Sequence, residues 1–421
     1  MDYSKLLVRG LCRGAFLTSV SIVLSLGASE ALGQESPPRE TVRQEVAKPL
    51  QTVQDLVNAK NYQEALAKIR EAEAVPDKTP YELFLIDQMR GPVAAAAGDR
   101  ALAIKSFEAI IDSGRLPPAK TLPMIEAIVG MYYQDKDYKG AATWAERFRN
   151  EGGINQKITL LRMQSLYFSG DYANAAREIS ADIHETEKSG KIPTEELLLL
   201  LANSSQKLGN QEAYVAILEK LVTYHPKNEY WAHLIYRVES KPTFVSRLTL
   251  NLYRLKFALG LISKASDYMT MALLAMQAGF PIEAKQVIEQ GFAKGVLGTG
   301  ADLAAQTKLR DLAIRDAEQD RKLMAQSEAD ALSAREGTGL VNVGFNYVID
   351  GQGGKGVALM ESGLRKGGLK RPEEAMLRLG MAYALTGQKQ KATDTLKAVQ
   401  GADGTGDLAR LWGLFALRPT R

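Results

Sequence analysis

The chain has 421 residues, of which 45% are hydrophobic and 24% are charged, an ordinary composition for a folded protein. This composition excludes a wholly disordered chain, a collagen and a polytopic membrane protein. The single cysteine, Cys12, excludes a disulfide framework and a cysteine-based zinc site. The formal net charge of +4 is too small to indicate nucleic acid as a partner.

Residues 1–33 have the three parts of a secretory signal peptide. A basic leader is followed by an apolar run over 15–26 and then by small residues that include Ala31 and Gly33. The apolar run is too short for a transmembrane helix, which needs about 20 residues. We expect cleavage after Ala31 or Gly33, export to the periplasm, and no transmembrane anchor in the mature chain. An uncleaved anchor is the alternative.

Cys12 lies before the apolar run and is followed by Arg13, whereas a bacterial lipoprotein has its cysteine just after the run. We therefore do not expect lipidation. Signal cleavage removes the only cysteine, which suits an oxidising compartment where a free thiol is readily modified. Residues 34–43, which include Pro37 and Pro38, are predicted to form a linker.

From residue 44 onward, apolar residues recur at intervals of three and four, which predicts helices separated by short turns. One phrase recurs: a turn with Gly, Lys or Asp, then a residue that is usually Ala, then an apolar residue four positions later. The first of these two positions holds Ala65, Ala103, Ala141, Ala175, Tyr214, Ala284, Gly356 and Ala392. Helices that cross closely admit only Gly or Ala at the crossing, so each phrase predicts a helix pair.

These phrases resemble the tetratricopeptide repeat, a helix–turn–helix unit of about 34 residues. The repeat's Leu-Gly-x-x-Tyr phrase is matched at 343–347, with Val in place of Leu, and at 379–383. The resemblance covers most of 44–400. It implies an all-α fold, a right-handed superhelical solenoid in which each unit buries an apolar face of the next.

We expect three regions after the linker. Residues 44–300 form an N-terminal array, in which 226–265 is a divergent unit with helices at about 229–239 and 243–259. Residues 301–336 lack the phrase and form a polar helical spacer, either one long helix or two shorter ones. Residues 337–421 form a C-terminal pair of units with a capping helix at 407–417, in which Trp412 is expected to face inward.

Groups of residues that can indicate cofactor binding, metal binding or catalysis have simpler explanations in this sequence. Gly351, Gly353 and Gly356 spell a dinucleotide-binding fingerprint, but that motif requires a preceding strand, and a helix over 339–350 is predicted instead. The three histidines are too far apart to suggest a metal site. Paired acidic residues fall at helix starts, where they favour the helix dipole. We therefore assign no catalytic, cofactor-binding or metal-binding residue and expect no enzyme.

The densest aromatic patch is open to two interpretations. It consists of Tyr224, Tyr230, Trp231 and Tyr236. It either packs an irregular joint between units or forms a docking surface, because Tyr and Trp dominate binding hot spots.

The inner helices of three successive units are expected at 127–133, 160–168 and 199–207. Residues one turn apart share a helix face. This places the following candidates for partner binding on the concave side: Tyr133, Gln164, Tyr167, Asn203 and Gln206. Such a groove can stack on apolar side chains and bind a peptide backbone by hydrogen bonds. Alternatively, Tyr133 and Tyr167 are half-buried structural residues.

The family's carboxylate clamp, a Lys followed four residues later by Asn, is not matched, because Leu199 precedes Asn203. The resemblance extends to exported bacterial proteins of the periplasm. It implies a non-catalytic scaffold for a protein or peptide of the cell envelope, as an accessory of an energy-transduction or outer-membrane assembly system. The alternative is the helical array of an enzyme system that cleaves cell-wall glycan. No small-molecule cofactor is expected.

Overall fold

The computed structural model describes residues 40–418, a range that is helical and contains no strand. The predicted signal peptide and most of the predicted linker lie outside the described residues. Contacts between helices divide the chain into two compact units, with the boundary between Gln211 and Glu212. No helix within 40–418 is both long enough and apolar enough to cross a membrane.

The first unit is a succession of helix pairs with one continuous apolar core from α1 to α8. Its helices are α1 (Gln44–Gln51), α2 (Val53–Asn58), α3 (Tyr62–Glu73), α4 (Pro80–Ala97), α5 (Arg100–Asp112), α6 (Pro118–Gln134), α7 (Tyr138–Asn150), α8 (Gln156–Phe168), α9 (Tyr172–Lys188) and α10 (Glu195–Lys207).

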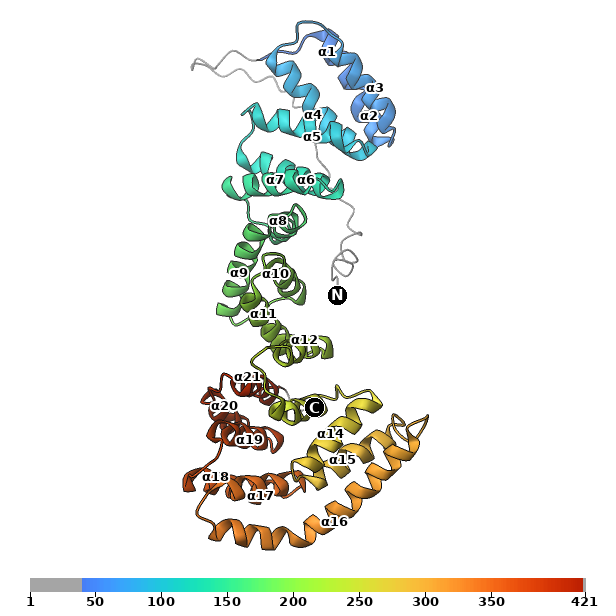
Figure 1. Cartoon of the computed structure of the whole chain (residues 1–421). Helices are drawn as coiled ribbons and strands as arrows, with labels where there is room; N and C mark the ends of the chain where they lie inside the picture. The colour runs from blue at the N-terminus through green and yellow to red at the C-terminus, as the bar shows by residue number, and fades with distance from the viewer. Residues whose placement is uncertain (1–39, 419–421) are drawn as a thin grey trace. The chain divides into compact units, whose positions relative to one another are not determined.

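The second unit has a long helix, α16, that lies along α15 and then packs against α17 (Figure 1). Residues 301–336 thus hold one long helix rather than two. The helices are α11 (Gln211–Tyr224), α12 (Asn228–Glu239), η2 (Ser246–Leu248), α13 (Thr249–Ala258), α14 (Ala265–Gln277), α15 (Pro281–Ala293), α16 (Leu303–Ser333), α17 (Thr338–Ile349), α18 (Gly353–Lys366), α19 (Pro372–Leu385), α20 (Lys389–Lys397) and α21 (Thr405–Ala416).

Every position that the recurring phrase marks for helix packing is buried. The small-residue positions lie on the second helix of each pair, and all of those named above are buried, Tyr214 included. The apolar positions one turn later are buried too: Ile69, Phe107, Ala145, Ile179, Leu218, Ile288, Met360 and Leu396. The predicted all-α helical repeat is therefore confirmed.

The turn of each phrase begins with a residue in the left-handed backbone conformation. These residues are Lys60, Gly98, Lys136, Gly170, Gly209, Gly279, Gly351 and Gly387, with φ between 61° and 88°. Two of them are lysines, which adopt this conformation less readily than glycine. The aspartate that follows Lys136, Asp137, accepts a hydrogen bond from the backbone N–H of Gly140 at 2.9 Å and so caps α7.

The pair α17 and α18 shows how close the crossing can be. A Cβ atom added to Gly356 of α18 comes within 2.7 Å of the backbone nitrogen of Val348 and meets the carbonyl oxygen of Gly344. Both obstacles are backbone atoms of α17, so they cannot rotate away. The glycines at 351–356 therefore form the turn and the crossing of one helix pair.

The tyrosine of the Leu-Gly-x-x-Tyr phrase ties successive pairs together. The Tyr347 hydroxyl donates to Glu328 of the preceding helix at 2.7 Å. The Lys355 ammonium pairs with the same carboxylate at 2.6 Å and lies 4.1 Å from the Tyr347 ring centroid. The same three contacts recur one unit later at Tyr383, Glu361 and Lys391.

The divergent segment between α12 and α13 differs from expectation at its second helix. That helix begins at Thr249, after the short helix η2, rather than near residue 243. The cause is a long-range contact: the backbone N–H of Val245 donates to the carbonyl of Asp403, and Lys241 pairs with Asp407 at 2.8 Å. The segment forms a turn, closed by a hydrogen bond from the Phe244 N–H to the carbonyl of Lys241 at 3.0 Å, and is held against the start of α21.

The aromatic patch of this segment divides between core and surface. Tyr230 and Trp231 are each 1% exposed, whereas Tyr236 is 68% exposed. The two buried rings favour a packing role over a docking surface. Trp412 of the capping helix α21 is also fully buried, as predicted.

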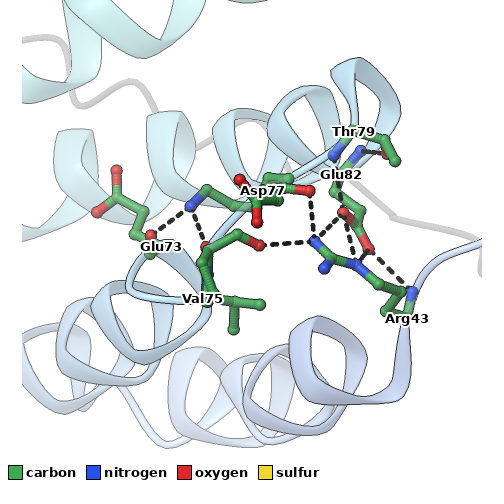
Figure 2. Close-up of polar contacts among 8 residues, drawn as sticks. Arg43, Glu73, Val75, Asp77, Thr79 and Glu82 are labelled. Atoms are coloured by element: carbon green, nitrogen blue, oxygen red, sulfur yellow. Dashed lines mark hydrogen bonds and ion pairs between the residues drawn. The ribbon is translucent and has the colours of Figure 1, made fainter.

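The N-terminal helix is fixed by an ion pair with the second helix pair (Figure 2). Arg43, at the start of α1, donates from Nε and Nη2 to the Glu82 carboxylate at 2.9 and 2.8 Å, and its backbone N–H donates at 3.0 Å. Glu82 also accepts from the backbone of Thr79 in a capping box at the start of α4. These hydrogen bonds, that of the Arg43 side chain first, lower the pKa of Glu82 from 4.5 to about 2.

We predict that the crossing of α17 and α18 at Gly356 tolerates no added methyl group. Gly356→Ala should lower the free energy of unfolding by about 1–3 kcal/mol, because backbone must move to admit Cβ. Gly354→Ala, in the same helix and with no atom near its Cβ position, should leave it unchanged or raise it by up to about 1 kcal/mol. Urea unfolding of both variants measures the difference, and equal stabilities would contradict the crossing described here.

We also predict a pH-dependent contribution from Glu82. Because its folded pKa is lowered, the stabilisation is fully present above about pH 4.5 and is lost as the pH falls through about 2. Glu82→Gln should therefore lower the melting temperature at pH 7, and its difference from the wild type should shrink below pH 4.5. Thermal unfolding followed by circular dichroism across this range is the measurement. Glu71→Gln, an exposed control on α3, should show little change at any pH.

Candidate functional site

The candidate residues lie on the first helices of three successive pairs in the first unit. Tyr133 is on α6, Gln164 and Tyr167 are on α8, and Asn203 and Gln206 are on α10. Helix α8 contacts both α6 and α10, so the three helices form one continuous surface. Side-chain caps fix where these helices begin: Asn155 accepts from the backbone at the start of α8, and Thr194 does so at α10.

A row of hydrogen bonds crosses all three helices. The Tyr133 hydroxyl donates to Oε1 of Gln164 at 2.9 Å, and Nε2 of Gln164 donates to Oε1 of Glu196 at 2.7 Å. Gln164 is only 1% exposed, so its amide bridges the neighbouring helices from within the surface. This glutamine therefore positions its neighbours and offers little surface to a partner.

The protonation state of Tyr133 preserves this row of hydrogen bonds. Burial first, and then the nearby Tyr138 and Glu196, raises the pKa of Tyr133 to about 12. The phenol therefore stays protonated and donates its hydrogen bond throughout the physiological pH range.

Aromatic rings form a second row beside the first. Tyr133 contacts Tyr138 edge to face at 5.5 Å between centroids, and Tyr138 contacts Phe168 at 5.0 Å. Phe168 contacts Tyr167 at 5.3 Å, and Tyr167 contacts Tyr172 at 5.4 Å. We call these five residues the aromatic row. Each ring is half-buried, so the row is held by its own packing and still presents ring edges to solvent.

The two candidates on α10 stand apart from both rows. Asn203 is half-buried and Gln206 is exposed. Within residues 40–418, no hydrogen bond or ring contact joins either of them to Tyr133, Gln164 or Tyr167. Their amides are therefore available to a ligand, whereas that of Gln164 is engaged. On the same helices, Met163 and Ala202 are 4% and 3% exposed, so they pack between helices.

Sequence reasoning did not select four residues that complete this surface. Tyr138, Phe168 and Tyr172 belong to the aromatic row, and Glu196 ends the hydrogen-bond row. Tyr138 and Tyr172 start their helices directly after the Asp of the turn phrase, so their recurrence was a usable signal. Glu196 had a sufficient explanation as an acidic residue in the first turn of a helix.

The described part of the chain brings together no cluster of three His, Cys, Asp or Glu side chains that could hold a metal ion. What the surface on α6, α8 and α10 can do is bind by contact: aromatic edges stack on apolar groups, and the amides of Asn203 and Gln206 donate and accept hydrogen bonds.

Comparisons with known proteins give distant likenesses. No curated protein matches the chain. A tetratricopeptide repeat protein of known structure from Parabacteroides merdae is 13% identical, over 81% of this chain and 99% of its own, with a TM-score of 0.30. The TPR2AB domain of yeast Sti1, in its complex with pHSP90, is 11% identical, over 70% of this chain and 99% of its own, with a TM-score of 0.25. At such scores we draw no conclusion from either structure.

The family comparison is more specific. Residues 196–228 and 374–401 match the family model of the tetratricopeptide repeat. The first segment corresponds to α10 and α11, and the second to α19 and α20. Both segments contain a buried position of the recurring phrase, Tyr214 and Ala392 respectively. These two segments of the chain therefore match the tetratricopeptide repeat, in agreement with the resemblance seen in the sequence.

Proposed function

We propose that this protein is a non-catalytic scaffold of the periplasm that binds a protein or peptide on the surface formed by α6, α8 and α10. The observation that carries the proposal is the aromatic row, whose half-buried rings are fixed by one another. Tyrosine supplies a large contact area and loses little conformational freedom on binding when its ring is already held.

The polar groups near this row favour an extended peptide as the ligand. The hydrogen-bond row from Tyr133 to Glu196 fixes the spacing of the three helices. Asn203 and Gln206 then present amides that match the donors and acceptors of a peptide backbone. The surface combines stacking with hydrogen bonding and carries no catalytic constellation. No observation favours the alternative role in cell-wall glycan cleavage.

The periplasmic location rests on the sequence of residues 1–33 alone. Their basic, apolar and small-residue parts are those that a signal peptidase reads. A partner in the cell envelope, as part of an energy-transduction or outer-membrane assembly system, follows from this location and from the family resemblance.

We predict that Tyr167 and Asn203 contribute directly to binding. The double substitution Tyr167→Ala with Asn203→Ala should weaken binding of a partner captured from the native envelope by about 2 kcal/mol or more, which is the cost of losing hot-spot residues. Gln164 is left unchanged because its removal disturbs the packing of three helices. The measurement is a titration of the captured partner against both chains.

The control for this titration is Glu185→Ala, an exposed position on α9. It should bind as the wild type does. Circular dichroism checks that the double variant remains folded. A folded double variant that binds within about 0.5 kcal/mol of the wild type places the binding site elsewhere.

We predict that the protein is exported and processed. Expressed in a bacterial host, it should be found in the periplasmic fraction with a mass that corresponds to loss of residues 1–31 or 1–33. Replacing two leucines of the apolar run, Leu24→Arg and Leu26→Arg, should retain it in the cytoplasm at full length. A wild-type chain that stays full-length in the cytoplasm overturns the proposed location.

A further inference from the structure

A buried charge cluster lies inside the second unit, remote in sequence from the surface discussed above. Arg254 of α13 is 4% exposed, and its Nε and Nη2 atoms donate to the two carboxylate oxygens of Glu283, each at 2.7 Å. Its Nη1 donates to Asn251 at 2.8 Å. The guanidinium also lies 4.7 and 4.5 Å from the ring centroids of Phe280 and Phe345. Every guanidinium nitrogen of Arg254 therefore has a hydrogen-bond acceptor.

A second arginine of the cluster, Arg378 of α19, is not satisfied in this way. Its Nη1 donates to the amide oxygen of Asn342. Its Nε is buried and has no acceptor within residues 40–418. Its Nη2 has no acceptor there either, and the residue as a whole is half-buried. No carboxylate of the described chain lies within ion-pair distance of Arg378.

The local charges leave a positive excess on this arginine. The charged groups that act on Arg378 are Arg254, Arg371, Glu283 and Glu374, and each carboxylate is paired with another arginine. Burial, and then the charge of Arg254, lowers the pKa of Arg378 to about 10, so the group remains a cation at neutral pH. One negative charge is needed to balance the cluster.

The surroundings of Arg378 restrict the size of a ligand. Its guanidinium lies 5.6 Å from the ring centroid of Phe280, the residue that precedes α15. Helix α15 also contacts α17, so the chain's own helices cover part of the face that α17 and α19 present. An extended peptide therefore fits this face poorly, whereas a small anion needs only the solvent-accessible side of Arg378 and the neighbouring exposed amide of Asn342.

We propose that Arg378 and Asn342 form a binding site for a small carboxylate anion, separate from the peptide surface of the first unit. A carboxylate brings the single negative charge that the cluster lacks, and one of its oxygens can accept a charge-assisted hydrogen bond from Nη2 of Arg378. The neighbouring Arg254, which is buried and binds the carboxylate of Glu283, shows that this cluster already pairs an arginine with a carboxylate. The amide nitrogen of Asn342 donates a second hydrogen bond to the anion. This site does not depend on the proposed scaffold function.

The test uses the whole mature chain and acetate as the probe. Saturation-transfer NMR of the acetate methyl protons, titrated at constant ionic strength with chloride, should give saturable binding. Arg378→Gln should weaken acetate binding at least tenfold, and Arg365→Gln, an arginine with a 70% exposed side chain on α18, should leave it unchanged. The absence of saturable binding, or equal affinity in Arg378→Gln, overturns the proposal. Inorganic phosphate that binds more tightly than acetate overturns the assignment to a carboxylate.

Two further variants keep the test decisive if Arg378→Gln does not fold. Arg378→Lys keeps the positive charge but removes the planar donors, so acetate binding should fall several-fold. Asn342→Ala changes an exposed side chain and should weaken acetate binding while the melting temperature without acetate stays that of the wild type. Wild-type acetate affinity in both folded variants contradicts the site.

Discussion

Every helix pair marked by the recurring phrase, except the one that carries Tyr214, has a small residue at the point where its two helices cross. At Ala103, Ala141, Ala175 and Ala392 this residue is fully buried, and at Gly356 even a methyl group meets the backbone of the facing helix. Close approach brings the apolar residue one turn later into contact with the partner helix. It also sets the distance at which the next pair packs, so the crossing fixes the geometry of the whole repeat.

The repeat could be predicted from sequence because its determinants are local. The left-handed residue of the turn, the capping Asp, the small residue and the large apolar residue all fall within one short stretch. In the unit around Gly170, Asp171 and Ala175, each of these has a geometric role that its residue type reveals. Capping helix α21 and its buried Trp412 could be predicted for the same reason, since its apolar residues recur with helical spacing.

Features that depend on contacts distant in sequence could not be predicted. The start of α13 is delayed because residues 241–245 pair with the segment before α21, and the pattern of 241–249 carries no sign of this contact. Gln164 was expected on an open surface. Helical spacing gives the face of a side chain but not its burial against neighbouring helices, and Gln164 is covered between α6 and α10. The buried pair of Arg254 and Glu283 is likewise formed by helices that the sequence does not align.

The surface on α6, α8 and α10 and the arginine cluster of the second unit handle polar residues in different ways, and this difference bears on how each can bind. On that surface, Gln164 bridges the Tyr133 hydroxyl and the Glu196 carboxylate and so holds the first ring of the aromatic row in place. Burial of charge in the second unit is costly unless each ion is paired, and Arg254 meets that condition through Glu283. Arg378 has no paired carboxylate within residues 40–418. A surface whose aromatic rings are already held in place gains from apolar contact with a partner, whereas a cation without a carboxylate gains most from an anion. The same repeat therefore presents two kinds of surface, and the difference comes from which polar side chains are satisfied internally.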